Sequence, residues 1–138
     1  MPINNAAIAA WAPRMLSVLR IVSGYMFLLH GTSKLFGMPH AAMFDNLQLM
    51  SMTGVAGILE LVGGVLLLLG AFTRPVAFVL SGEMAAAYFM VHAPHGFWPI
   101  INKGELAVAY CFVFLYIAAH GAGAFSLDGM RRKTVTGG

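Results

Sequence analysis

The sequence has little charge and almost no cysteine. Only 9% of its 138 residues are charged, and 59% are hydrophobic. Soluble domains carry about 25% charged and about 45–50% apolar residues, so this composition excludes an ordinary soluble domain. The single cysteine, Cys111, excludes an intrachain disulfide and a cysteine-rich metal site, and we expect no metal centre. Cys111 stands within a long apolar stretch, where a thiol is expected to pack as a small side chain and not to act as a nucleophile.

Long hydrophobic runs replace the missing charge. Crossing a hydrocarbon core of about 30 Å takes about 20 residues of helix. Four stretches reach about this length, near residues 15–36, 54–72, 75–93 and 104–123. The sequence therefore predicts an all-α integral membrane protein in which a single domain, residues 1–138, forms a four-helix bundle.

The few basic residues are unevenly distributed. In a four-span arrangement, one side carries Arg14, Arg74 and the basic residues at 131–133, and the other carries Lys34 and Lys103. The more basic side of a membrane protein faces the cytoplasm, so both termini are predicted to be cytoplasmic. The net charge of +3 largely reflects this asymmetry. No basic stripe is interleaved with aromatic residues, so we expect no nucleic-acid partner.

Acidic residues are also scarce, and three of the five stand in the predicted spans: Glu60, Glu83 and Glu105. A charged side chain in hydrocarbon costs roughly 2.5–3.5 kcal/mol or more. Each of these carboxyl groups therefore needs a partner, a proton or a water-filled cavity. The three acids mark the interior where a functional site is expected.

One cluster can be assembled from depth alone. Counting about 1.5 Å per residue from the outer face places His30 and Glu60 both roughly 9 Å deep. Lys34 lies on the same helix face as His30, one turn nearer the surface. Gly57 and Gly64 flank Glu60 at helical spacing, and small residues let membrane helices approach closely, so Glu60 is expected to face the bundle. Histidine titrates near neutrality, and we interpret His30, Lys34 and Glu60 as candidate catalytic residues that handle protons.

The same cluster has other interpretations. It can bind a quinone carbonyl and relay a proton to it, and it can equally bind an anion or a polar headgroup. Ion pairs between membrane helices can also simply fix helix register. We expect such a pair between Arg20 and Glu83, which both lie near the midplane.

A third polar group lies at the outer rim. Asn102 and Glu105 have the spacing of a helix cap, which is a purely structural interpretation. His92 ends the third span, nine residues after Glu83 and therefore on the opposite face of a straight helix, so the two residues need not share a cavity. Glu83, His92 and Glu105 are the candidate cofactor-binding residues.

Five short motifs, taken in order, resemble the DoxX family. They are HGTSKLFG from His30, GILELVGG from Gly57, GAFTR from Gly70, VHAPHGFW from Val91 and NKGELA from Asn102. The resemblance covers most of the chain, about residues 19–128. It implies a multi-pass bacterial or archaeal protein with four spans, here in the bacterial inner (plasma) membrane. Members of the family are associated with quinone-linked sulfur oxidation and with membrane oxidoreductase assemblies.

Carried onto this sequence, the resemblance falls on His30, Lys34, Glu60, Arg74, Glu83, His92 and Glu105. The family pattern leads us to expect a small or neutral residue at position 103, and Lys103 departs from it. The implied function is that of a membrane component of a quinone-linked oxidoreductase system, with a polar site in the outer half and quinone as the expected cofactor. Electrons must come from a partner or a bound redox group, because the chain itself has no group that carries them.

Other functions stay open. Ten methionines and the Gly- and Ala-rich helix faces also suit a non-catalytic membrane scaffold or accessory subunit. A small transporter is expected to show inverted repeats, which the sequence does not. A haem protein would need axial ligands, and His30 and His92 form a candidate pair near the outer face, but the histidines of cytochromes usually lie deeper in the spans. The expected partners are the lipid bilayer and either another protein or a second copy of the chain.

Overall fold

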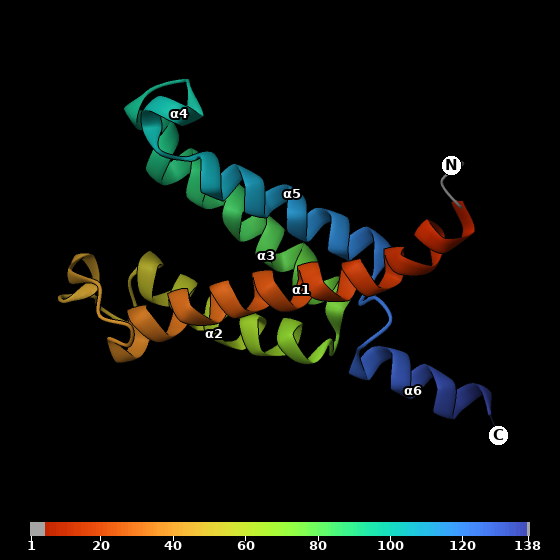
Figure 1. The fold of residues 1–138 in the computed structure, drawn as a ribbon. Coiled ribbons are helices and arrows are strands. Elements are labelled where there is room, and N and C mark those ends of the chain that lie inside the picture. The colour runs from red at the N-terminus through yellow and green to blue at the C-terminus, as the bar shows by residue number, and fades with distance from the viewer. Residues whose placement is uncertain (1–4, 138) are drawn as a thin grey trace.

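The computed structural model describes residues 5–137, and within that range it contains helices and no β-strand. Four long helices make up most of the molecule: α1 (Asn5–Phe36), α2 (Met52–Leu69), α3 (Thr73–Ala87) and α5 (Glu105–His120). Helices α1 and α2 form one antiparallel hairpin, and α3 and α5 form a second (Figure 1). The prediction of an all-α fold is confirmed.

Short elements join and extend these helices. A 3₁₀ turn, η1 (Ala42–Phe44), lies in the connection from α1 to α2. Helix α3 continues through a π-helical segment, η2 (Tyr88–His92), and a 3₁₀ turn, η3 (Ala93–His95), towards the short helix α4 (Pro99–Asn102). Beyond α5, helix α6 (Leu127–Thr136) points away from the two hairpins (Figure 1).

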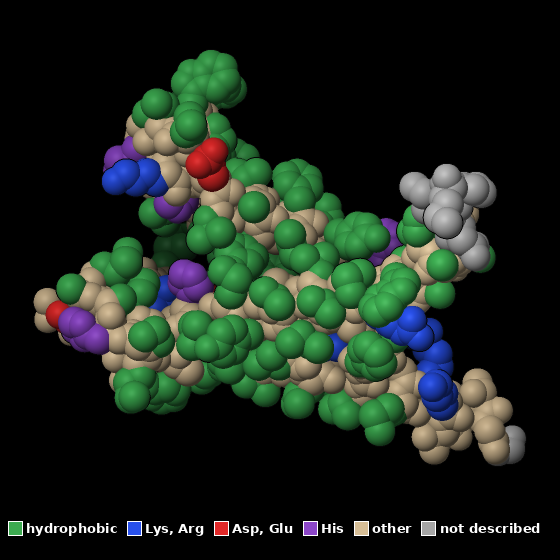
Figure 2. Space-filling model, viewed as in Figure 1, with side chains coloured by type: hydrophobic (Ala, Val, Ile, Leu, Met, Phe, Trp, Pro, Cys, Tyr) green, Lys and Arg blue, Asp and Glu red, His purple; other side chains and the backbone are tan. Residues whose placement is uncertain are grey.

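Within residues 5–137, three helical stretches are long and apolar enough to cross a membrane: Asn5–Phe36, Met52–Leu69 and Thr73–His95. The fourth apolar helix, α5, has only 16 residues, although it runs beside α3 along its length. Helix α1 begins well before the expected span at residue 15. Figure 2 shows hydrophobic side chains covering the helices, with the charged side chains gathered towards the ends of the molecule.

Glycine allows the close packing of the first hairpin. A Cβ atom at Gly64 would lie 2.6 Å from the backbone nitrogen of Leu28, closer than real Cβ atoms approach other atoms. Gly57 packs in the same way against Lys34, with 3.1 Å between a Cβ built there and the Cβ of Lys34. Glu60 lies between these glycines on α2 and is 3% exposed. The predicted glycine-lined contact around Glu60 is therefore present.

The guanidinium of Arg20 joins three segments at the end of the bundle where α2 and α5 finish. It is fully buried and donates hydrogen bonds to four backbone carbonyls. Two belong to Leu67 and Leu68 at the end of α2, and two belong to Ala122 and Phe125 after α5. The last carbonyls of a helix lack the usual partner four residues on, and Arg20 supplies a donor to two such carbonyls of α2.

An aromatic core joins the two hairpins. The ring of Phe27 on α1 meets the rings of Phe114 and Tyr110 on α5 edge-on, with centroids 4.6 Å and 4.9 Å apart. Leu67 of α2 and Leu80 of α3 are fully buried in the same core. Towards α4 and the α1–α2 connection the two hairpins diverge (Figure 1), and this divergence makes room for a cavity.

Candidate functional site

A cavity of about 880 Å³ lies between the two hairpins, where they diverge. Its lining comes from α1, α2, α3, α5, the segment η2 and the connections α1–α2 and α4–α5, and most of it is apolar. Figure 2 shows the molecule hollowed between the hairpins, with histidine and basic side chains near the opening. Of the six candidate site residues, this cavity brings together five: His30, Lys34, Glu60, Glu83 and His92.

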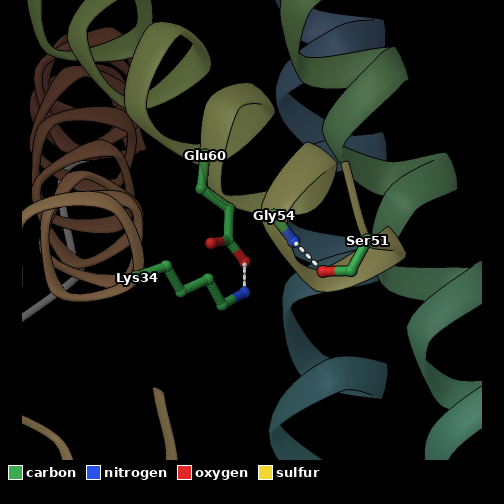
Figure 3. A network of polar contacts seen from close by, with 4 residues as sticks. All are labelled: Lys34, Ser51, Gly54 and Glu60. Carbon is green, nitrogen blue, oxygen red and sulfur yellow. Dashed lines mark hydrogen bonds and ion pairs between the residues drawn. The ribbon is translucent and has the colours of Figure 1, made fainter. Parts of the chain in front are cut away.

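An ion pair lies at one wall of this cavity. The ammonium nitrogen of Lys34 on α1 donates to Oε1 of Glu60 on α2, with 2.7 Å between the two atoms (Figure 3). The Lys34 and Glu60 side chains are only 11% and 4% exposed. The second oxygen of Glu60, Oε2, is buried and has no hydrogen-bond partner among the residues that the structure describes. The predicted proximity of Lys34 and Glu60 is therefore observed, and half of the carboxylate remains available.

The N-terminal cap of helix α2 helps to position Glu60. Ser51 precedes the helix, and its hydroxyl oxygen accepts a hydrogen bond from the N–H of Gly54 at 3.1 Å (Figure 3). A serine at this position satisfies one of the unpaired N–H groups of the first turn. The cap fixes where α2 begins, and so fixes the level at which Glu60 faces α1.

Glu83 lines the cavity from the other hairpin, and the prediction that it pairs with Arg20 is wrong. Both carboxyl oxygens of Glu83 are buried, and neither forms a hydrogen bond within the described part of the chain. Arg20, which we expected to pair with it, instead donates to four backbone carbonyls where α2 and α5 end. The physical reason is that helix-end carbonyls, which the sequence pattern does not reveal, compete for the guanidinium.

His92 and Glu83 line the same cavity, although a straight helix places them on opposite faces. The difference comes from η2, where the helix widens to a π-helix over residues 88–92. A π-helix turns less per residue than an α-helix, so it changes the direction of the residues that follow. Nδ1 of His92 then lies 3.0 Å from the backbone oxygen of Asn102.

Asn102 and Glu105 do not form the expected helix cap. The residue before α5 is Gly104, and its N–H donates to the side-chain oxygen of Asn102 at 2.8 Å. Asn102 is 5% exposed, and its amide donates to the backbone oxygen of Gly96 at 2.9 Å and to the hydroxyl of Tyr88 at 3.3 Å. Glu105 is the first residue of α5, is exposed and lies outside the cavity lining.

Two other basic residues, Lys103 and Arg74, lie in different parts of the molecule. Lys103 lines the cavity and has a left-handed backbone with φ of 60°, which is uncommon for a residue other than glycine. The site predicted from the sequence does not include Lys103, although the departure of this residue from the family pattern was a signal. Arg74 instead donates to the backbone oxygens of Ala118 and Ala119 at 3.2 Å and 2.5 Å, at the end of α5.

The DoxX family model matches residues 15–93 of this chain, more than half of its length. The chain belongs to the DoxX family. The matched region of this DoxX protein contains α1 from residue 15 onwards, all of α2 and α3, and all five candidate residues that line the cavity. Its membership and its apolar helices make it a membrane protein.

Several proteins are similar to this DoxX protein over most of their length. An uncharacterized protein of Haemophilus influenzae is 50% identical over 127 residues, covering 86% of this chain and 91% of the relative. A Bacillus subtilis protein named "Putative oxidoreductase CatD" is 29% identical over 113 residues, covering 80% and 82%. An uncharacterized membrane protein of Mycobacterium tuberculosis is 25% identical, covering 99% and 97%. No solved structure matches the chain.

Proposed function

We propose that this protein binds the headgroup of a quinone in the cavity between its hairpins, and that it serves as a membrane component of a quinone-linked oxidoreductase system. One observation carries the proposal. Three buried carboxyl oxygens, Oε2 of Glu60 and both oxygens of Glu83, lack a hydrogen-bond partner within residues 5–137 and belong to residues that line a mostly apolar cavity. Buried polar groups are normally hydrogen-bonded, so these atoms call for a ligand, a proton or water.

The cavity fits a quinone in size and chemistry. Its volume of about 880 Å³ lies within the range of about 300–1,000 Å³ that is usual for small-molecule sites. A quinone head is a flat, apolar ring with two carbonyl oxygens, and it needs apolar walls with a few polar groups. Phe27, Leu59 and Met84 contribute such walls, and Lys34 and Glu60 contribute polar atoms. The oxidoreductase name of the Bacillus subtilis relative supports the same class of function.

The chemistry follows from the Lys34–Glu60 pair. A bound quinone supplies a couple that carries both electrons and protons. The Lys34 ammonium has three donors, and Glu60 uses one of them, so another is available to a ligand carbonyl. Oε2 of Glu60 is the atom that takes or supplies the proton, and His30 lines the same cavity as a second donor. The electrons come from a partner protein or another redox group.

The distribution of basic residues indicates in which half of the membrane this cavity lies. The ends of α1 and α2 that border the cavity lie away from the basic helix α6 (Figure 1). If the more basic end is cytoplasmic, the cavity lies in the outer half of a bacterial inner membrane. A quinone, which is lipid-soluble, would then enter the cavity from the bilayer.

Substitution of Glu60 tests the proposal. In Glu60→Gln the charged acceptor Oε2 is lost, so a short-chain benzoquinol, whose hydroxyl group donates to that oxygen in the wild type, should bind roughly tenfold more weakly, since a hydrogen bond to a charged group is worth about 1.5–3 kcal/mol. Quinone reduction in membranes that contain the electron donor should fall as well. Binding is measured by calorimetry on detergent-solubilised protein. Glu105→Gln is the matched control, because Glu105 is an exposed carboxylate outside the cavity, and it should bind like the wild type.

The unfolding midpoint separates a lost site from a lost fold. Glu60→Gln leaves Lys34 without its partner, so a double variant, Lys34→Gln with Glu60→Gln, removes the remaining charge as well. Equal quinol binding by the wild type and a folded Glu60→Gln protein would show that Glu60 is a structural residue and would contradict the proposed role.

A further inference from the structure

The imidazole of His92 has one nitrogen engaged and one free. Nδ1 lies 3.0 Å from the backbone oxygen of Asn102. A backbone carbonyl can only accept, so Nδ1 must carry the hydrogen of this bond. In the neutral ring Nε2 then holds a lone pair. Within residues 5–137 no hydrogen bond engages Nε2, and His92 lines the cavity.

We infer that His92 accepts a hydrogen bond from a ligand hydroxyl in this cavity, so that the site prefers a quinol, which bears hydroxyl groups, to the corresponding quinone. A quinone carbonyl offers no hydrogen to a lone pair on Nε2. The inference rests on the proposed function and adds to it the redox form that the His92 side of the cavity selects.

The carbonyl that sets this tautomer is firmly held. The side chain of Asn102 is buried and forms hydrogen bonds with Gly96, Tyr88 and Gly104 at 2.9 Å, 3.3 Å and 2.8 Å. Its backbone N–H donates to the oxygen of Trp98 at 2.9 Å. Asn102 therefore acts through His92 as a positioning residue, and its buried amide has a role beyond ending α4.

The two sides of the cavity thus present different chemistry. On the first hairpin, Lys34 offers hydrogen-bond donors next to the Glu60 carboxylate. On the second hairpin, His92 offers an acceptor at Nε2. A molecule with one hydroxyl hydrogen directed to His92 and one oxygen directed to Lys34 satisfies both sides, and a quinol can do so because each of its oxygens both donates and accepts.

The tautomer can be measured without any ligand. In protein labelled with ¹⁵N-histidine, the ring-nitrogen chemical shifts distinguish a protonated from an unprotonated nitrogen. At pH 8, His92 should show a protonated Nδ1 and an unprotonated Nε2, with its signals assigned by their loss in His92→Asn. Asn102→Ala should shift the population towards the other tautomer. A wild-type His92 that is protonated on Nε2 would overturn the inference.

Ligand preference is the second test. The amide nitrogen of His92→Asn can replace Nδ1 and keep the bond to Asn102, but this side chain has no atom at the position of Nε2. We expect it to bind a short-chain benzoquinol about three- to tenfold more weakly than the wild type and to bind the benzoquinone unchanged. The matched control is His95→Asn: His95 makes the same kind of bond, from Nδ1 to the backbone oxygen of Val91 at 2.9 Å, but is exposed and outside the cavity lining.

The outcomes separate this inference from the function on which it rests. If wild type and His92→Asn bind both redox forms alike, the acceptor role of His92 is overturned and the quinone site stands. If the wild type binds neither form, the proposed function fails, and the preference for a quinol fails with it. Weaker quinol binding in His92→Asn alone, with His95→Asn unchanged, supports the inference.

Discussion

A Cβ atom placed on Gly31 would lie 2.5 Å from the backbone nitrogen of Leu61 and 2.7 Å from its Cα. Both atoms belong to the backbone of a packed helix and cannot move aside as a flexible side chain does. Gly31→Ala should therefore push α1 away from α2 and lower the free energy of unfolding by about 1–3 kcal/mol. The measurement is the unfolding midpoint in detergent.

Gly82→Ala is the control for this substitution. It also lies inside a long helix, but a Cβ there meets no atom within 4 Å. Alanine is favoured over glycine in a helix by roughly 0.5–1 kcal/mol, so this variant should be as stable as the wild type or slightly more stable. Equal midpoints for the Gly31 and Gly82 variants would mean that the α1–α2 contact tolerates separation.

Single residues also show how far the sequence could predict the site. The proximity of Lys34 to Glu60 follows from counting depth along two predicted spans, because regular helices keep a constant rise per residue. The partner of Arg20 could not be predicted in the same way. Its four acceptors are backbone carbonyls, two at the end of α2 and two in the connection after α5, and every residue has such a carbonyl whatever its side chain. Side-chain pattern gives no sign of which carbonyls lack a partner.

At the scale of elements, the main departure from the sequence-based prediction is the wide turn in the continuation of α3. Pro94 follows it closely and has no N–H to donate, so a regular hydrogen-bond ladder cannot run through that point. The helix widens to a π-helix over Tyr88–His92 before it ends in a 3₁₀ turn. Proline signals an end or a kink, but it does not say how the preceding turn adjusts. That adjustment brings His92 to the same cavity as Glu83.

The start of α3 depends on a side chain from another helix. Asp128 of α6 accepts hydrogen bonds from the N–H groups of Phe72 and Thr73 at 3.0 Å and 2.9 Å, as a capping side chain does. Burial alone raises the pKa of Asp128, but the hydrogen bonds from Thr73 and Phe72, together with the charge of Arg131, outweigh burial and hold that pKa below its ordinary value. Asp128→Asn should therefore lower the free energy of unfolding at pH 7 by about 1 kcal/mol.

The direction of the pH dependence follows from that pKa. Because the folded-state pKa of Asp128 is depressed, its contribution is complete above the unfolded-state pKa of about 3.9 and is lost as the pH falls through the lower, folded-state value. The difference in unfolding midpoint between wild type and Asp128→Asn should be constant from pH 7 to about pH 5 and should shrink below about pH 4. Asp45→Asn, at an exposed carboxylate in the α1–α2 connection, is the control. A difference that persists undiminished at pH 2 would exclude capping by the ionised form.

At the scale of the molecule, the polar contacts divide between two ends. Where α2 and α5 finish, Arg20 and Arg74 donate to carbonyls at the ends of α2 and α5, and Asp128 caps α3. Where the hairpins diverge, carboxyl oxygens of Glu60 and Glu83 remain without partners among the described residues. Polar contacts thus join the segments at one end, and the cavity lies towards the other. The sequence predicts the helices and their apolar faces, but the divergence depends on how two hairpins pack through a shared aromatic core, which periodicity along one helix does not describe.

The fold brings most of the exposed basic residues to one end of the molecule, as the predicted membrane orientation requires. The beginning of α1 and helix α6 lie at the same end of the molecule (Figure 1), and the exposed basic residues Arg14, Arg131, Arg132 and Lys133 belong to these two segments. Since cytoplasmic segments carry the excess of Lys and Arg, we predict that this end is cytoplasmic and that the α1–α2 connection lies outside.

Single cysteines can test this orientation, because Cys111→Ala removes the only thiol of the sequence. In that background, Asn46→Cys should react with a membrane-impermeant maleimide in intact spheroplasts, since Asn46 is exposed in the α1–α2 connection. Thr134→Cys on α6 should react only after the membrane is permeabilised. The opposite pattern would invert the protein and place the cavity in the inner half of the membrane. Labelling of both positions in intact spheroplasts would mean that an even number of spans separates them, which is incompatible with α2, α3 and α5 all crossing the bilayer.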